Sequence, residues 1–165
     1  MHHPATLAAS GSTARNPSLS QWEAVTRQAL AVAHENGAGG AGAALAAYEQ
    51  ALSIARQLLV APPAGRAEDC VAALVVSCHN LADLHIAHGD ADAAAGYLCR
   101  AHESLLALLV DTDRTTSLRE AALRHSRATH LALISHVAAH GPHPLITRVM
   151  RMGCLALNVD GPTRH

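Results

Sequence analysis

The stretch from Asn80 to Leu105, NLADLHIAHGDADAAAGYLCRAHESL, predicts the architecture of the whole chain. Leucine and alanine recur at helical spacing on both sides of a Gly89-Asp90 pair. Glycine is a common residue just past the end of a helix, and aspartate is a favoured N-cap because its carboxylate accepts hydrogen bonds from free backbone N–H groups. The stretch therefore predicts two antiparallel helices joined by a tight turn.

The composition of the full chain agrees with a helical protein. Half of the 165 residues are apolar, and alanine, the strongest helix former, is the most frequent residue. This apolar fraction excludes an intrinsically disordered chain. A formal net charge of -1 provides no basic footprint for nucleic acid or an anionic membrane. The absence of lysine beside 12 arginines is typical of codon bias in a GC-rich bacterial genome.

Helix-capping and helix-terminating residues divide the chain into six predicted helices. Capping boxes at 20–23 and 117–120 begin the first and the fifth, and Gly37 is expected to stop the first. Proline and glycine at 62–65 and 141–142 end the second and the fifth. We expect an all-α domain over residues 20–158 after a flexible tail at 1–19, with hairpins at about 20–61, 66–110 and 117–157.

The predicted hairpins resemble one another in sequence. Equivalent leucines stand at positions 30, 81 and 133, which are 51 and 52 residues apart. The third copy is fainter and has Gly153 where alanine would be expected. Self-similarity at a fixed period is typical of helical repeat proteins. The matching positions are Leu30, Ala31, His34, Ala44, Tyr48 and Ala51 in the first copy, and Leu81, Ala82, His85, Ala94, Leu98 and Ala101 in the second.

This pattern resembles the tetratricopeptide repeat (TPR), whose motif runs W-x2-L-G-x2-Y and then A-x3-F. The stretch 80–105 is the best match, and 45–52 (LAAYEQAL) is the next. The resemblance implies antiparallel hairpins stacked as a TPR-like superhelical array, and an unrelated six-helix bundle is the alternative. The chain departs from the motif in its longer period, in lacking the closing proline, and at Arg27, Cys78, His34 and His85, which replace motif aromatics.

The resemblance also implies a function, because the first helix of each TPR hairpin lines a concave groove. A groove of mixed polarity suits an extended peptide or an amphipathic helix, so we expect a non-enzymatic scaffold or adaptor for a protein or peptide partner. The carboxylate-clamp subtype of the family is excluded because its lysine is missing here. The groove positions carried onto this chain are Gln28, Val32, Glu35, Val76, His79, Asp83, Ile86, Leu131 and Ser135.

Thirteen histidines provide two further hypotheses. Residues four apart share a helix face, so His136 and His140, with His143 beyond the turn, form an alternative zinc or copper site. No H-E-x-x-H arrangement is present, so a zincin-type hydrolase is not indicated. If several histidines are buried in their neutral form, acid will destabilise the domain, because histidine titrates near pH 6.5.

No catalytic motif stands out in the chain. A nucleophile elbow and a P-loop are both missing from the sequence, so we predict no enzyme activity and no cofactor. The four cysteines form no C-x-x-C pair and are expected to be small buried hydrophobes. No secretory signal and no apolar run near the roughly 18 residues of a membrane span are apparent, so we expect a cytoplasmic protein without nucleic-acid or membrane partners.

The last predicted helix carries an apolar stripe wider than an end-capping helix usually exposes. We expect it to fold back over the fifth helix. A homodimer formed through this helix is the alternative, and a secretion-chaperone-like dimer is also compatible with the repeat resemblance. The stripe consists of Leu145, Ile146, Val149, Met150 and Leu157.

Overall fold

The computed structural model describes residues 16–35 and 40–158, and every regular element among them is a helix. The all-α prediction is confirmed for these residues. Residues 1–15 of the expected tail, and Gly37, lie outside the described residues. The six helices are α1 (Leu19–Glu35), α2 (Ala41–Val60), α3 (Ala67–Ala87), α4 (Ala91–Val110), α5 (Thr116–His140) and α6 (Pro144–Asn158).

The turn between α3 and α4 forms as the sequence predicts. Gly89 has a φ of +76°, a left-handed conformation that side chains disfavour. The N–H groups of Gly89 and Asp90 donate to the carbonyl oxygens of Ile86 and His85 at 3.0 and 2.9 Å, which closes the end of α3. The Asp90 carboxylate then accepts from the N–H of Ala93 at 2.9 Å as the N-cap of α4. One short turn therefore reverses the chain direction.

The predicted N-caps at Ser20 and Ser117 are wrong, and in each case the helix begins earlier. Ser18 accepts from the N–H of Gln21 at 3.1 Å, and Thr115 accepts from the N–H of Leu118 at 3.3 Å. Leu118 and the Leu19 that follows Ser18 are buried in the core. Tertiary packing selects the hydroxyl that places each leucine in the first turn, where it faces the core.

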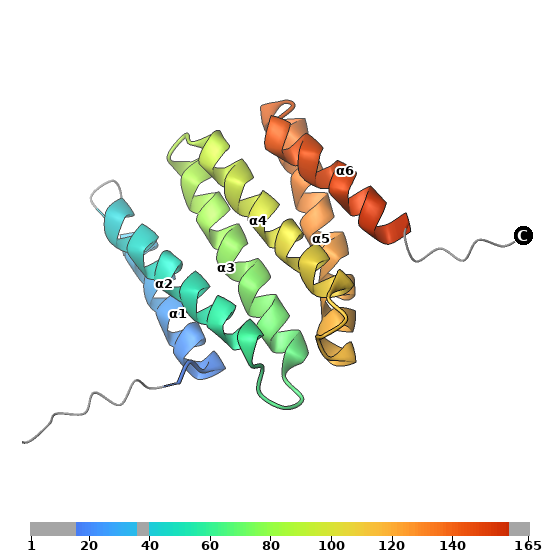
Figure 1. The fold of residues 1–165 in the computed structure, drawn as a ribbon. Helices are drawn as coiled ribbons and strands as arrows, with labels where there is room; N and C mark the ends of the chain where they lie inside the picture. The colour runs from blue at the N-terminus through green and yellow to red at the C-terminus, as the bar shows by residue number, and fades with distance from the viewer. Residues whose placement is uncertain (1–15, 36–39, 159–165) are drawn as a thin grey trace, which may run out of the picture.

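The helices pack in two layers around α3 (Figure 1). Each of the first four helices packs against the next, and further contacts join α1 to α3 and α3 to α5. The main core includes eight fully buried leucine, valine and cysteine side chains, most of them on α3. Trp22 ties α1 to α3, because its indole N–H donates to the buried Ser77 hydroxyl at 2.8 Å. This arrangement is a helical array of antiparallel neighbours.

The third hairpin differs from the first two. Helices α1 and α2, like α3 and α4, pack along each other, but α5 and α6 contact each other only slightly. Helix α6 packs chiefly against α4, and Figure 1 shows it in front of α5. Ile146 and Val149 are fully buried there, in a second core cluster with Leu98 of α4 and Leu133 of α5. Helix α6 therefore folds back onto the array as expected, but its main contacts are with α4 rather than with α5.

We expected no apolar run of this length, but α3 is the one described helix that is long and apolar enough to cross a membrane by length and composition alone. Its position in the array accounts for this composition. Helix α3 contacts α2, α4 and α5 at once, so apolar side chains are needed on most of its circumference. The apolar run is that of a central core helix.

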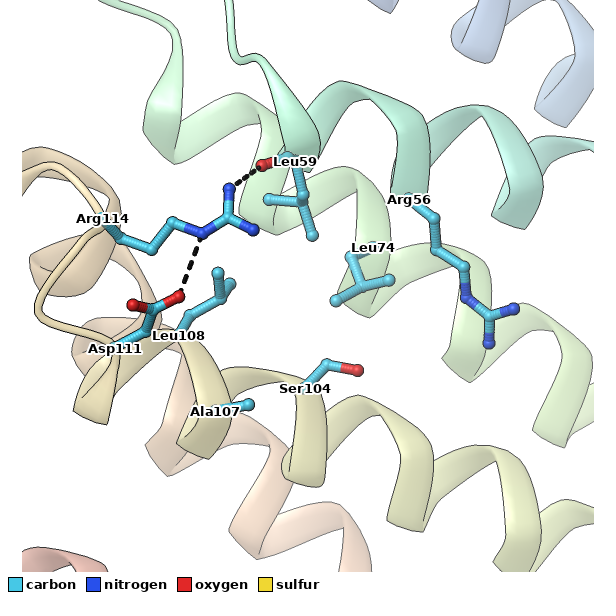
Figure 2. A pocket seen from close by; sticks show the side chains of 8 residues that line it. All are labelled: Arg56, Leu59, Leu74, Ser104, Ala107, Leu108, Asp111 and Arg114. Carbon is cyan, nitrogen blue, oxygen red and sulfur yellow. Dashed lines mark hydrogen bonds and ion pairs between the residues drawn. The ribbon is translucent and has the colours of Figure 1, made fainter.

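Arg114 links the loop after α4 to the end of α2 (Figure 2). Its guanidinium donates to the carbonyl oxygens of Leu59 and Val60 at 3.0 and 3.4 Å, and its Nε lies 3.3 Å from a carboxylate oxygen of Asp111. The last carbonyls of a helix have no partner within the helix, so Arg114 supplies one from 54 residues away. A cavity of about 260 Å³ lies beside it, with Arg56 on its rim.

Replacing Arg114 with methionine is expected to lower the free energy of unfolding by about 1–2 kcal/mol, since the half-exposed guanidinium makes charged hydrogen bonds to otherwise unpaired carbonyls. Arg56 borders the same cavity without a hydrogen bond or ion pair to any described residue, so Arg56→Met should change stability by less than about 0.5 kcal/mol. Urea unfolding of both variants measures the difference. Equal changes in the free energy of unfolding of the two variants would contradict a stabilising role for the hydrogen bonds of Arg114.

Candidate functional site

The predicted groove positions lie on α1, α3 and α5, as the repeat resemblance implies, and none of them lines the two hollows beside α6. Ile86 packs against the second core cluster. His79 is half-buried, its Nε2 has no hydrogen-bond partner among the described residues, and burial lowers its pKa. Val32 is also half-buried, and the exposed members are Gln28, Glu35, Val76, Asp83, Leu131 and Ser135.

The alternative metal ligands lie near one another without forming a complete site. The rings of His136 and His140 are 4.7 Å apart between centroids, and His143 Nε2 lies 3.3 Å from a carboxylate oxygen of Asp92. Within residues 16–35 and 40–158, no three His, Cys, Asp or Glu side chains are placed to hold one metal ion. Burial, followed by the nearby His140 and His143, lowers the pKa of His136.

A cleft of about 660 Å³ lies where α5 and α6 separate over α4. Its floor comes from α4, one wall from α5 and the other from α6. We refer to it as the α4–α5–α6 cleft. It is lined by His102 and Leu106 of α4, Leu123, Arg124, Ser126, Arg127 and His130 of α5, and Met150, Gly153 and Cys154 of α6.

Gly153 allows α6 to lie close to α4 at the floor of the cleft. A Cβ atom at this position would be 3.2 Å from Nε2 of His102 and 3.6 Å from a methyl carbon of Leu106. The alanine that the repeat pattern leads one to expect here would therefore press on the His102 ring. The third copy of the repeat therefore has glycine at position 153, where the His102 ring fills the space that a Cβ atom would need.

His102 is held in one orientation by Thr129. Its Nδ1 lies 2.7 Å from the Thr129 hydroxyl oxygen, and that hydroxyl donates its only hydrogen to the carbonyl oxygen of Ser126 at 3.0 Å. The Nδ1 atom must therefore be the donor to Thr129, which leaves Nε2 as an unprotonated acceptor in neutral His102. Burial lowers the pKa of His102, and the neighbouring His130 lowers it further. The floor of the cleft is thus uncharged at neutral pH.

Apolar surface continues from the cleft onto the outer side of α6. A second hollow of about 590 Å³ shares Met150 and Cys154 with the cleft and extends to Leu155. Leu155 is 68% exposed and Leu123, on the opposite wall, is 50% exposed. Large exposed apolar side chains grouped around a hollow are typical of interaction sites.

Arginines supply all the charge that lines these two hollows. Arg124 is already neutralised, because it donates to Glu68 of α3, and this contact is the main reason why the pKa of Glu68 is lowered. Arg127 on α5 and Arg151 on α6 are exposed and make no ion pair or hydrogen bond with any described residue. No Asp or Glu lines either hollow.

Cysteine burial follows the prediction at three of four positions. Cys70, Cys78 and Cys99 are buried, and burial raises the pKa of Cys78 and of Cys99 to about 11, so neither is a reactive thiolate at neutral pH. Cys154 is exposed at the cleft, contrary to the expectation of a buried thiol.

Sequence reasoning missed the cleft, although two of its signals are visible in the sequence. Gly153 breaks the alanine pattern of the repeat, and the apolar stripe of the last helix is wider than an end-capping helix usually exposes. Neither signal states where α6 packs. Only the contact between α6 and α4 shows that α5 is left with an open side.

Residues 20–165, which include all six helices apart from the first residue of α1, match a family described as protein of unknown function (DUF2753). No curated protein and no solved structure matches the chain significantly. Because the family match covers most of the sequence, the chain belongs to the DUF2753 family.

Proposed function

We propose that the protein is a non-enzymatic adaptor that holds a helical segment of a partner protein in the α4–α5–α6 cleft. The observation that supports this proposal is the separation of α5 from α6 over α4. In the first two hairpins, the corresponding pair of helices pack along each other and close the gap between them. The third pair leaves a gap with apolar walls, and a helix from another protein can fill it.

The shape and chemistry of the cleft favour a helix as the occupant. Its walls are helices, so a third helix can pack its side chains between theirs as helices do in protein cores. An amphipathic helix lays its apolar face into such a groove, and the side chains at i, i+3, i+4 and i+7 are its anchors. The exposed apolar side chain of Leu155, in the hollow that adjoins the cleft, extends the surface beyond the cleft, which supports a partner longer than a small molecule.

The groove on α1, α3 and α5 is the competing location for the same adaptor function. Its exposed members are mostly polar, and Val76 and Leu131 are its large exposed apolar side chains. A partner bound there would contact different helices. One substitution in each surface therefore separates the two locations.

The test is selection of helical peptides from a display library against the purified protein. We expect enriched peptides to bind the wild-type protein and to lose at least about tenfold in affinity for Leu123→Glu, because the substitution replaces an apolar side chain of the wall with a charged one. Val76→Glu in the groove should bind as the wild-type does. Val60→Glu, which alters an exposed valine at the end of α2, is the matched control.

Circular dichroism and thermal unfolding must show that all three variants fold, which their exposed positions favour. Peptides that ignore Leu123→Glu but lose affinity for Val76→Glu would place the binding site in the groove. Failure to enrich any peptide above a protein-free control would contradict the adaptor function itself.

A further inference from the structure

We infer that the helix recognised by the α4–α5–α6 cleft carries carboxylates along both edges of its apolar stripe, and that these pair with Arg127 on the α5 wall and with Arg151 in the adjoining hollow on α6. This inference rests on the proposed function and specifies the chemistry of the partner. It follows from the charges that line the cleft and its extension on α6.

The arginines of the cleft differ in what they already bind. Arg124 is occupied, because its guanidinium donates to Glu68 at 3.0 Å and His125 contacts the other oxygen of the same carboxylate at 2.8 Å. Arg127 and Arg151 have no such partner among the described residues and are exposed. They are therefore the two cations of this surface that are available to a carboxylate from outside.

The two available arginines come from different helices. Arg127 lines the cleft from α5, and Arg151 lines the hollow that continues from the cleft on α6. The apolar residues Met150 and Cys154 belong to both hollows. A helix that places its apolar stripe over Met150 and Cys154 thus meets one cation from α5 and one from α6, and complementary charges are expected on both of its edges.

The same charges argue against a second copy of this chain as the occupant. A twofold-symmetric dimer places the same surface of each subunit against itself. Since no Asp or Glu lines the cleft or its extension, such a dimer would bring arginines together without compensating carboxylates. Charge complementarity therefore favours a different, acidic protein segment over self-association.

Three synthetic peptides test the inference. Each has the same leucine stripe at i, i+3, i+4 and i+7, and the residues flanking the stripe are all glutamate, all glutamine or all lysine. At about 20 mM salt, the glutamate peptide should bind roughly threefold to tenfold more tightly than the glutamine peptide, and the lysine peptide more weakly than either. Fluorescence anisotropy of the labelled peptides gives the dissociation constants. The preference should largely vanish at about 500 mM salt because the arginines are exposed.

The double variant Arg127→Gln/Arg151→Gln should bind the glutamate and glutamine peptides equally. The matched control is Arg27→Gln/Arg56→Gln, which removes the same net charge at exposed positions of α1 and α2 and should keep the preference. Loss of the preference in both double variants would overturn the inference, because it would show an effect of net charge.

The remaining outcomes separate this inference from the proposed function. If the glutamine peptide binds and the glutamate peptide binds no better, the charge inference fails while the adaptor function stands. If none of the three peptides binds although the display library yields binders, the charge inference alone fails, and if the library yields no binder either, both fail. A dimer of the free protein in sedimentation equilibrium that dissociates in Leu123→Glu would show that a second copy occupies the cleft, and it would overturn the acidic partner.

Discussion

Replacing Leu133 with alanine will lower the free energy of unfolding by about 2–5 kcal/mol, a large part of the roughly 5–15 kcal/mol that stabilises a domain. Leu133 is fully buried and packs in the cluster that joins α4, α5 and α6. Truncation removes the transfer free energy of its side chain and leaves a cavity between three helices. Urea unfolding monitored by circular dichroism measures the loss.

Leu131 is the matched control, because it lies two residues away on the same helix and is 55% exposed. Leu131→Ala should change stability by no more than about 0.5 kcal/mol. Hydrogen exchange adds a local readout, since Leu133 packs in one cluster with Ile146 and Val149 of α6. Relative to the wild-type protein, Leu133→Ala should accelerate backbone amide exchange more in α6 than in α1 and α2. Uniformly faster exchange in all helices would contradict a separate α4–α5–α6 cluster.

The free energy of unfolding will also fall as the pH is lowered from about 7.5 to about 5. Burial is the largest cause of a lowered pKa at His79, His102 and His136. Between the folded pKa and the unfolded value near 6.5, the unfolded chain binds more protons than the folded one. Stability therefore rises with pH in this window, by up to about 1.4 kcal/mol per pH unit for each proton of difference.

His102→Asn isolates one of these contributions. The asparagine amide can replace Nδ1–H as the donor to Thr129 but does not titrate, so the variant should have a shallower pH dependence than the wild-type protein. Chemical unfolding at four or five pH values between 5 and 8 measures both slopes. The carboxylate of Glu68, whose pKa is lowered, loses its contribution at pH values below about 4.5 and does not interfere. An equal unfolding free energy across the range would contradict a pH-sensitive core.

The turn at Gly89-Asp90 and the helix caps show how far local reasoning extends. The turn was predicted correctly because glycine at positive φ and an aspartate cap act within a few residues of the chain. The caps of α1 and α5 were placed too late because both regions contain more than one hydroxyl able to cap, and the choice depends on where the buried Leu19 and Leu118 point. The candidate groove residues were placed on the expected helices, while the cleft was not predicted at all.

The sequence by itself determined that this protein is helical, where its six helices lie, and which turn joins α3 to α4, because hydrophobic spacing and capping operate over one or two helical turns. The tertiary structure alone decided that α6 packs on α4, that Gly153 makes room for His102, and that Arg114 reaches the end of α2. The physical reason is that hydrophobic burial has no direction. An apolar stripe states that a helix will be covered, and only the competition between whole surfaces decides which neighbour covers it and which gap stays open.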